Sequence, residues 1–103
     1  MNRIRFVTSD IYGFLKSFDD HLVTKIFGLL EALDQFGVYL NPTRLKKINK
    51  DIYELRITGR IAIRIFIVFK NDIVYILHAF VKKSQKLPKK DLEIAISRLK
   101  YLQ

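Results

Sequence analysis

The chain has 103 residues, half of them apolar, which is enough to bury the core of one domain. It contains no cysteine, so disulfides, thiolate metal sites and a cysteine nucleophile are excluded, and two histidines alone do not make a zinc site. A net charge of +9 indicates a polyanionic partner, because a basic surface attracts phosphates and gains from counterion release.

The positive charge is concentrated in one part of the chain. Residues 1–40 carry four basic and five acidic side chains, so the remaining 63 residues hold a net charge of +10. A basic surface can simply keep a protein in solution, but its concentration in one part favours nucleic-acid binding. Apolar runs such as Ile65–Phe69 are far too short to span a bilayer, so we expect one cytoplasmic domain over residues 1–103.

The first 40 residues read as a strand followed by two helices. Ile4 and Phe6 alternate with charged residues, which predicts a short half-buried strand. Ser9 or Asp10 is expected to cap a first helix over residues 11–15. A second helix is predicted to begin at residues 19–20, where two aspartates favour a helix N-terminus, and to end before Gly37.

The rest of the chain has strand character up to a last helix. Runs rich in β-branched and aromatic residues predict strands over 52–57, 61–69 and 73–81, with turns at 58–60 and 70–72. Pro88 suits the first turn of a final helix. The order β-α-α-β-β-β-α indicates an α+β domain, in which a helical hairpin packs on a small, mostly antiparallel sheet. We expect the other face of the sheet to be free for a ligand.

Arg64 is the most unusual residue, because it is the only polar side chain between Ile61 and Phe69. A charge on such a strand must meet a carboxylate or open into a groove that receives an anion. Glu54 is the nearest carboxylate on the preceding strand. A three-residue loop with Gly59 at positive φ places Glu54, Arg56 and Arg64 on one face, whereas a two-residue loop turns Arg64 to the opposite face.

Two interpretations of Arg64 follow from this pairing. It forms an internal salt bridge with Glu54, or it is a clamp that holds two oxygens of a scissile phosphate while Glu54 orients it. Lys82, Lys83 and Glu54 are candidates for the general base that would deprotonate a ribose 2′-hydroxyl.

The segment from His78 to Pro88 offers a second set of candidates. Phe80 and Lys82 point the same way while the strand lasts, which suits base stacking beside a phosphate contact. The alternative is that Phe80 belongs to the core and the lysines are a solvated strand end. His78 is either a proton shuttle or a packed residue with one hydrogen bond. His21 is expected to be a surface residue.

Residues 45–102 resemble the phage-derived, HigB-like branch of the RelE/ParE toxin superfamily. The similarity rests on Ile-Tyr-Glu-Leu-Arg at 52–56, on Arg64 before an aliphatic and aromatic strand, and on Leu-His-Ala-Phe-Val-Lys-Lys-Ser-Gln-Lys-Leu-Pro at 77–88. Ala95 and Arg98 of the last helix also match. Two positions depart from the common pattern, because Ile63 stands where a tyrosine often precedes the strand arginine and Ala79 stands where a glycine often precedes the phenylalanine.

The resemblance implies a type II toxin that cuts messenger RNA on the ribosome without a metal or cofactor. Its partner would be an antitoxin, often a helix-turn-helix repressor. The expected catalytic residues are Arg64, Arg56, Lys82, Lys83 and Glu54. The expected RNA-binding residues are Lys46, Lys47, His78, Phe80, Gln85 and Lys86. The alternatives are a ParE-like inhibitor of DNA gyrase, and an inactive module that only binds nucleic acid or an antitoxin, since one fold can serve several targets.

Overall fold

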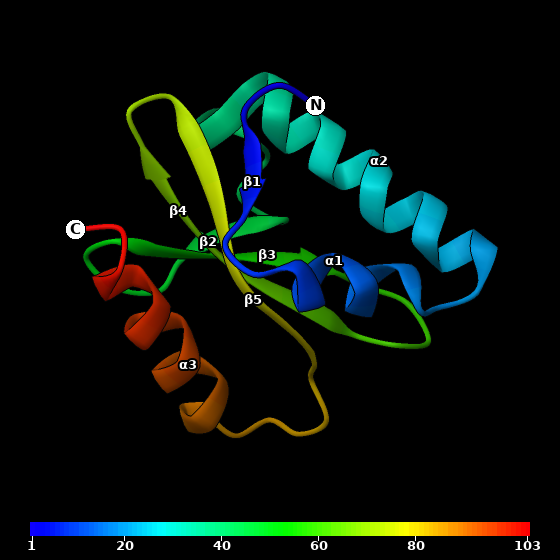
Figure 1. Cartoon of the computed structure of the whole chain (residues 1–103). Coiled ribbons are helices and arrows are strands. Elements are labelled where there is room, and N and C mark those ends of the chain that lie inside the picture. The colour runs from blue at the N-terminus through cyan, green and yellow to red at the C-terminus, as the bar shows by residue number, and fades with distance from the viewer.

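The computed structural model describes all residues from 1 to 103 and confirms the predicted α+β class (Figure 1). It contains three α-helices, one short 3-10 helix and a five-stranded sheet. In chain order the elements are β1 (Ile4–Phe6), α1 (Ser9–Lys16), α2 (Asp20–Phe36), the 3-10 helix η1 (Gly37–Tyr39), β2 (Leu45–Lys47), β3 (Ile52–Ile57), β4 (Ile63–Lys70), β5 (Ile73–Val81) and α3 (Lys89–Lys100). No helix in it is long and apolar enough to cross a membrane.

The sheet is mixed and has the strand order β1-β5-β4-β3-β2. Three of its four strand pairs are antiparallel, and β1 lies parallel to β5 at one edge. The strand β2 at the other edge was not predicted, because its three residues are one leucine and two lysines with no β-branched or aromatic side chain. Its partner β3 gives it a strand conformation that its own sequence does not favour.

Helices cover both faces of this sheet, as Figure 1 shows. The helices α1 and α2 pack on one face over a core of 15 buried residues, whereas α3 packs on the other face over a smaller core of seven. The expectation of an entirely free second face was therefore wrong. Ala95 and Leu99 of α3 are buried against that face, and only the part beyond the start of α3 remains open.

The loop between β3 and β4 is longer than predicted but keeps the predicted alternation. Ile57 pairs with Ile63, so five residues rather than three connect the strands, and Gly59 has a φ of 150°. A five-residue loop and a three-residue loop both join strands without exchanging their faces, because the side-chain period is two. Arg56 therefore lies directly opposite Arg64.

The hairpin of β4 and β5 contains two local features that direct its side chains. Asn71 and Asp72 both have positive φ, at 52° and 66°, as a two-residue turn that matches the strand twist requires. Further along, the register shifts so that Leu77 is an extra residue on β5. This bulge places both Leu77 and His78 toward α3, whereas Ala79 belongs to the core under α1 and α2.

The observed helix ends agree in part with those predicted from the sequence. The helix α2 begins at Asp20, as predicted, and the Asp19 carboxylate caps it by accepting a hydrogen bond of 2.9 Å from the backbone nitrogen of Leu22. Gly37 ends α2 with a φ of 56°. The expected cap of α1 was wrong, since α1 begins at Ser9 itself and Thr8 is the capping position. Pro88 lies just before α3 rather than within its first turn.

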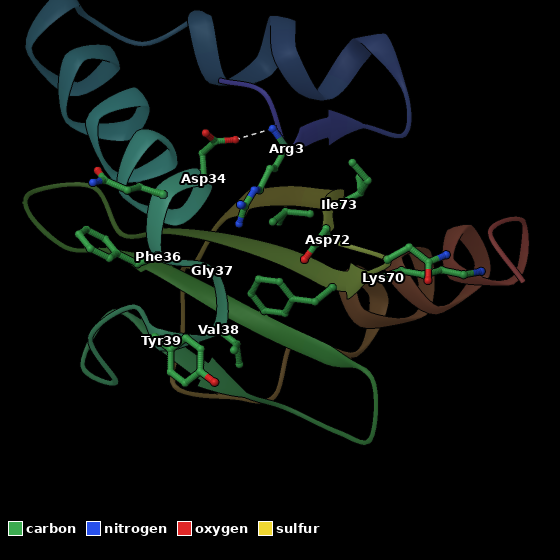
Figure 2. Close-up of a pocket in the computed structure, with 13 residues that line it drawn as sticks. Arg3, Asp34, Phe36, Gly37, Val38, Tyr39, Lys70, Asp72 and Ile73 are labelled. Atoms are coloured by element: carbon green, nitrogen blue, oxygen red, sulfur yellow. Dashed lines mark hydrogen bonds between the residues drawn. The ribbon is translucent and has the colours of Figure 1, made fainter.

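A polar contact ties the end of α2 to β1 at a hollow of about 380 Å³ (Figure 2). The backbone nitrogen of Arg3 donates a hydrogen bond of 2.6 Å to Asp34, drawn as a dashed line in Figure 2. This backbone hydrogen bond holds the pKa of the Asp34 carboxyl below its usual value. The hollow also reaches the turn between β4 and β5, including Asp72.

Candidate nucleic-acid interface

The uncovered end of the α3-side face carries an unusual group of charged side chains. Arg56 on β3 lies opposite Arg64 on β4, and Arg64 lies opposite Phe80 on β5. Glu54 lies two residues before Arg56 and so points to the same face. The structure thus brings together the three residues that the sequence predicted to share a face.

Glu54 is the one polar or charged residue that is fully buried, with 3% of its surface exposed. Its Oε1 atom accepts a hydrogen bond of 2.9 Å from Nε of Arg56 and lies 3.9 Å from Nε of Arg64. A buried carboxylate needs such partners, because taking an unpaired charge out of water costs several kcal/mol. Glu54 therefore holds two guanidinium groups side by side under the open end of the sheet.

Arg64 is only partly satisfied by this arrangement. Its side chain is 13% exposed, and its Nη1 donates a hydrogen bond of 3.2 Å to the carbonyl oxygen of Ile63. Its Nε atom is buried and has no hydrogen-bond partner, since Glu54 lies at ion-pair distance but too far for a hydrogen bond. A buried donor left unpaired costs about 1–3 kcal/mol, a cost that an incoming anion can offset.

Both arginines line a groove of about 360 Å³ between the sheet and the segment that leaves β5. The backbone nitrogen of Lys82 donates a hydrogen bond of 2.8 Å to the carbonyl oxygen of Ala62, which holds this segment beside the end of β4. The groove lining contains four cations and no carboxylate: Arg56, Ala62, Arg64, Lys82, Lys83, Ser84 and Gln85. Such a groove attracts phosphate, which arginine can bind through two N–H groups at once.

Phe80 does not serve as an open platform for stacking bases, and this expectation was wrong. It is 8% exposed and packs against Phe66, with ring centroids 5.2 Å apart. It belongs to the core under α3, because α3 and the β5 bulge close over that part of the sheet. The alternative interpretation, that Phe80 is a core residue, is the one that the structure supports.

His78 also lies outside the groove. Its Nε2 atom lies 2.8 Å from an Asp91 carboxylate oxygen at the start of α3, and its ring stacks on Phe80 at a centroid distance of 5.8 Å. It does not line the groove. The structure therefore fits the interpretation of His78 as a packed residue with one hydrogen bond, which fastens β5 to α3 below the lysine-rich segment.

The other residues predicted to bind RNA lie at different places in the fold. Lys46 lies opposite Glu54 and so shares the face of the arginines, whereas Lys47 lies opposite Tyr53 on the other face. Lys47 Nζ lies 5.8 Å from the centre of the Tyr53 ring, so Lys47 does not share a surface with the arginines. Gln85 lines the groove, and Lys86 lines an adjoining hollow of about 220 Å³ together with Lys82 and Lys83.

Arg98 joins α3 to β5 and to α1, a role that the sequence analysis did not assign. Its Nη1 donates a hydrogen bond of 2.8 Å to the carbonyl oxygen of Leu77 at the bulge, and its Nη2 lies 3.7 Å from the Asp10 carboxylate. The nearby Thr8 side chain and the positive charge of Arg98 lower the pKa of Asp10. No sequence signal marks this role, because the bulge that it stabilises is a product of strand pairing.

The fold and the groove define a small α+β protein of the RelE-like kind, with a paired arginine centre at the open end of its sheet. The chain belongs to the family of phage-derived Gp49-like proteins (DUF891), whose sequence model matches residues 13–100. This family is a RelE/ParE-like toxin family. No curated protein matches the sequence significantly. The superfamily part of the resemblance is thereby confirmed.

Proposed function

We propose that this protein is the toxin of a type II toxin-antitoxin system, of the HigB-like branch, that cleaves messenger RNA on the ribosome. The observation that carries the proposal is the buried, unpaired Nε of Arg64 in a groove lined by four cations. A phosphate diester is the ligand that this groove fits, because it presents a diffuse negative charge and two free oxygens.

The chemistry would be attack of a ribose 2′-hydroxyl oxygen on the neighbouring phosphorus atom, with loss of the hydroxyl proton to a base supplied by the ribosome and departure of the 5′-oxygen. Arg56 and Arg64 would stabilise the additional negative charge on the phosphate oxygens. Lys82 and Lys83 would donate a proton to the leaving 5′-oxygen. Glu54 is best placed as a positioning residue, because its Oε1 already accepts the hydrogen bond of Arg56.

The groove supplies no free carboxylate or imidazole that would accept the 2′-hydroxyl proton. This supports dependence on the ribosome, since a catalytic set that is incomplete in the free protein can be completed by the particle on which it acts. In the same proposal a cognate antitoxin, a helix-turn-helix protein, holds the toxin inactive in the cytoplasm. Such a partner would neutralise or cover the basic groove.

The test compares wild-type protein with an Arg64→Ala variant in a translating extract, followed by mapping of the messenger RNA ends. Wild type is expected to produce cuts within translated regions, and the variant to lose at least about 100-fold in rate, as expected when a main charge-stabilising donor is removed. The variant is expected to stay folded in a urea titration. Lys47→Ala, on the opposite face, is the matched control and keeps full activity.

Three outcomes would contradict this proposal. Intact messenger RNA together with accumulated cleaved DNA would identify a gyrase inhibitor instead. Unharmed growth on expression without a partner, with intact RNA, would identify an inactive binding module. An Arg64→Ala variant that keeps its activity but loses a few kcal/mol of stability would make the arginine pair a purely internal salt bridge.

A further inference from the structure

The cationic side chains of the groove continue across the sheet to its edge. On the α3-side face, Lys46 of β2 is followed by Arg56 of β3 and Arg64 of β4. Lys82 and Lys83 come next, where the chain leaves β5 beside Ala62. These residues form a line that runs across the strands from the edge strand β2 to the end of β5, and we call it the cation track.

The length of the cation track sets the size of its ligand. Neighbouring strands lie about 4.8 Å apart, and Lys46 and Lys82 are also offset by about four residues along the strands, so the Cα atoms at the two ends of this diagonal track are roughly 20 Å apart. The long, flexible lysine side chains at both ends can reach inward, so two internucleotide linkages of an extended single strand, with three successive phosphates, fit between them. The side chains of Arg56 and Arg64 are only 34% and 13% exposed, so a ligand must enter the groove to reach them. A flexible single strand can bend to do so.

Lys46 is free to bind an anion at the β2 end of the track. It is exposed, and none of the ion pairs of the structure involves it. Its neighbour Glu54 is buried and pairs with the guanidinium groups of Arg56 and Arg64, so it offsets one charge of the arginine pair and leaves the track with a net positive charge. Lys47 has the same charge and exposure but faces the opposite side, over the ring of Tyr53.

We infer that the cation track holds three consecutive phosphates of a single-stranded RNA: one at Lys46, one at the Arg56 and Arg64 pair, and one at Lys82 and Lys83. The inference rests on the proposed function and names the extent of its substrate. The middle phosphate is the one at the arginine centre. Lys46 is then a substrate-binding residue that lies one nucleotide away from the reacting bond.

The experiment measures binding of fluorescent oligonucleotides by anisotropy, using the full-length protein without the ribosome. The oligonucleotides carry 2′-O-methyl groups, so that no cleavage through the 2′-oxygen occurs, and contain from one to six phosphates. Affinity is expected to rise with each phosphate up to three and to change little beyond that number. Lys46→Ala should abolish the gain from the third phosphate and reduce the slope of log affinity against log salt by about 0.7.

Lys47→Ala is the matched control and should leave both the length dependence and the salt slope unchanged, while Lys46→Arg should restore them. Circular dichroism would establish that each variant is folded. Equal losses in Lys46→Ala and Lys47→Ala, or a length dependence that ends at one or two phosphates, would overturn the cation track while leaving RNA binding in place. A wild-type protein that binds no oligonucleotide of any length would overturn the proposed function itself.

Discussion

The two faces of the sheet use the same strands for different purposes. On the face under α1 and α2, the inward side chains of β4 are apolar, as Ile63, Ile65 and Ile67 illustrate with no exposed surface. On the opposite face, the alternate positions of β3 and β4 include Glu54, Arg56 and Arg64. Alternation along a strand thus separates a face that stabilises the fold from one that can bind an anion.

The two faces of the sheet also differ in how much free energy they contribute to folding. The apolar face contributes free energy through burial, which needs no particular orientation of its side chains. The charged end of the other face reduces that contribution, because the Nε of Arg64 is buried without a hydrogen bond. The free energy lost at this site must be offset elsewhere in the fold, and burial of the 15-residue core under α1 and α2 offsets it here.

A cavity in the apolar face is expected to have the largest effect on stability. Ile65→Ala removes a fully buried side chain from the centre of β4 and is expected to lower the free energy of unfolding by about 2–5 kcal/mol. The midpoint and slope of a urea titration measure the change. Ile65→Val is the matched control, with an expected loss of about 0.5–1.5 kcal/mol. Residual folded protein should still bind RNA, because the charged face is untouched.

Glu54→Gln tests the residue at which the two functions meet. The substitution keeps the shape of the side chain but removes the charge that Arg56 and Arg64 share. We expect a loss of about 2 kcal/mol in the free energy of unfolding, less than for a fully buried pair because Arg56 is one-third exposed.

RNA cleavage by the Glu54→Gln variant should fall at the same time, since the arginines lose their orientation. Urea titration and an assay of messenger RNA ends measure the two effects separately. Full activity together with unchanged stability would show that Glu54 does not hold the arginine pair.

The sequence predicted the features of the two sheet faces that depend on the local pattern of residues. It predicted the bounds of β3 and β5, the start of α2 and the common face of Glu54, Arg56 and Arg64, because strand alternation and helix N-terminal preferences act over a few residues. The loop after β3 was predicted with the wrong length, yet the same-face prediction survived since only its parity matters.

The features that sequence did not reveal depend on contacts between distant segments. The strand β2 forms because β3 offers it a partner, and Phe80 is buried because α3 folds back over β5. The bulge at Leu77 turns His78 toward Asp91 instead of toward the groove. The opposite orientation of Lys46 and Lys47 follows from a strand that the sequence alone does not indicate.

The smallest expected effect lies away from both faces, where Asp34 joins the end of α2 to β1. The backbone hydrogen bond from Arg3 lowers the pKa of this carboxyl, so the folded state favours its charged form. The pKa of an aspartate in the unfolded chain is about 3.8, and the pKa of Asp34 in the folded protein is lower. The charged carboxylate therefore stabilises the folded state at pH values above 3.8, and this stabilisation is lost as the pH falls through the folded pKa.

Asp34→Asn should therefore be less stable than wild type at pH 7, and the difference should shrink below about pH 4. Urea midpoints of the two proteins at pH 7, 5 and 3 measure it. A difference that stays constant or grows toward pH 3 would contradict the assignment. An unchanged RNA affinity is expected at pH 7, because the hollow that contains Asp34 (Figure 2) shares no lining residue with the groove of the arginines.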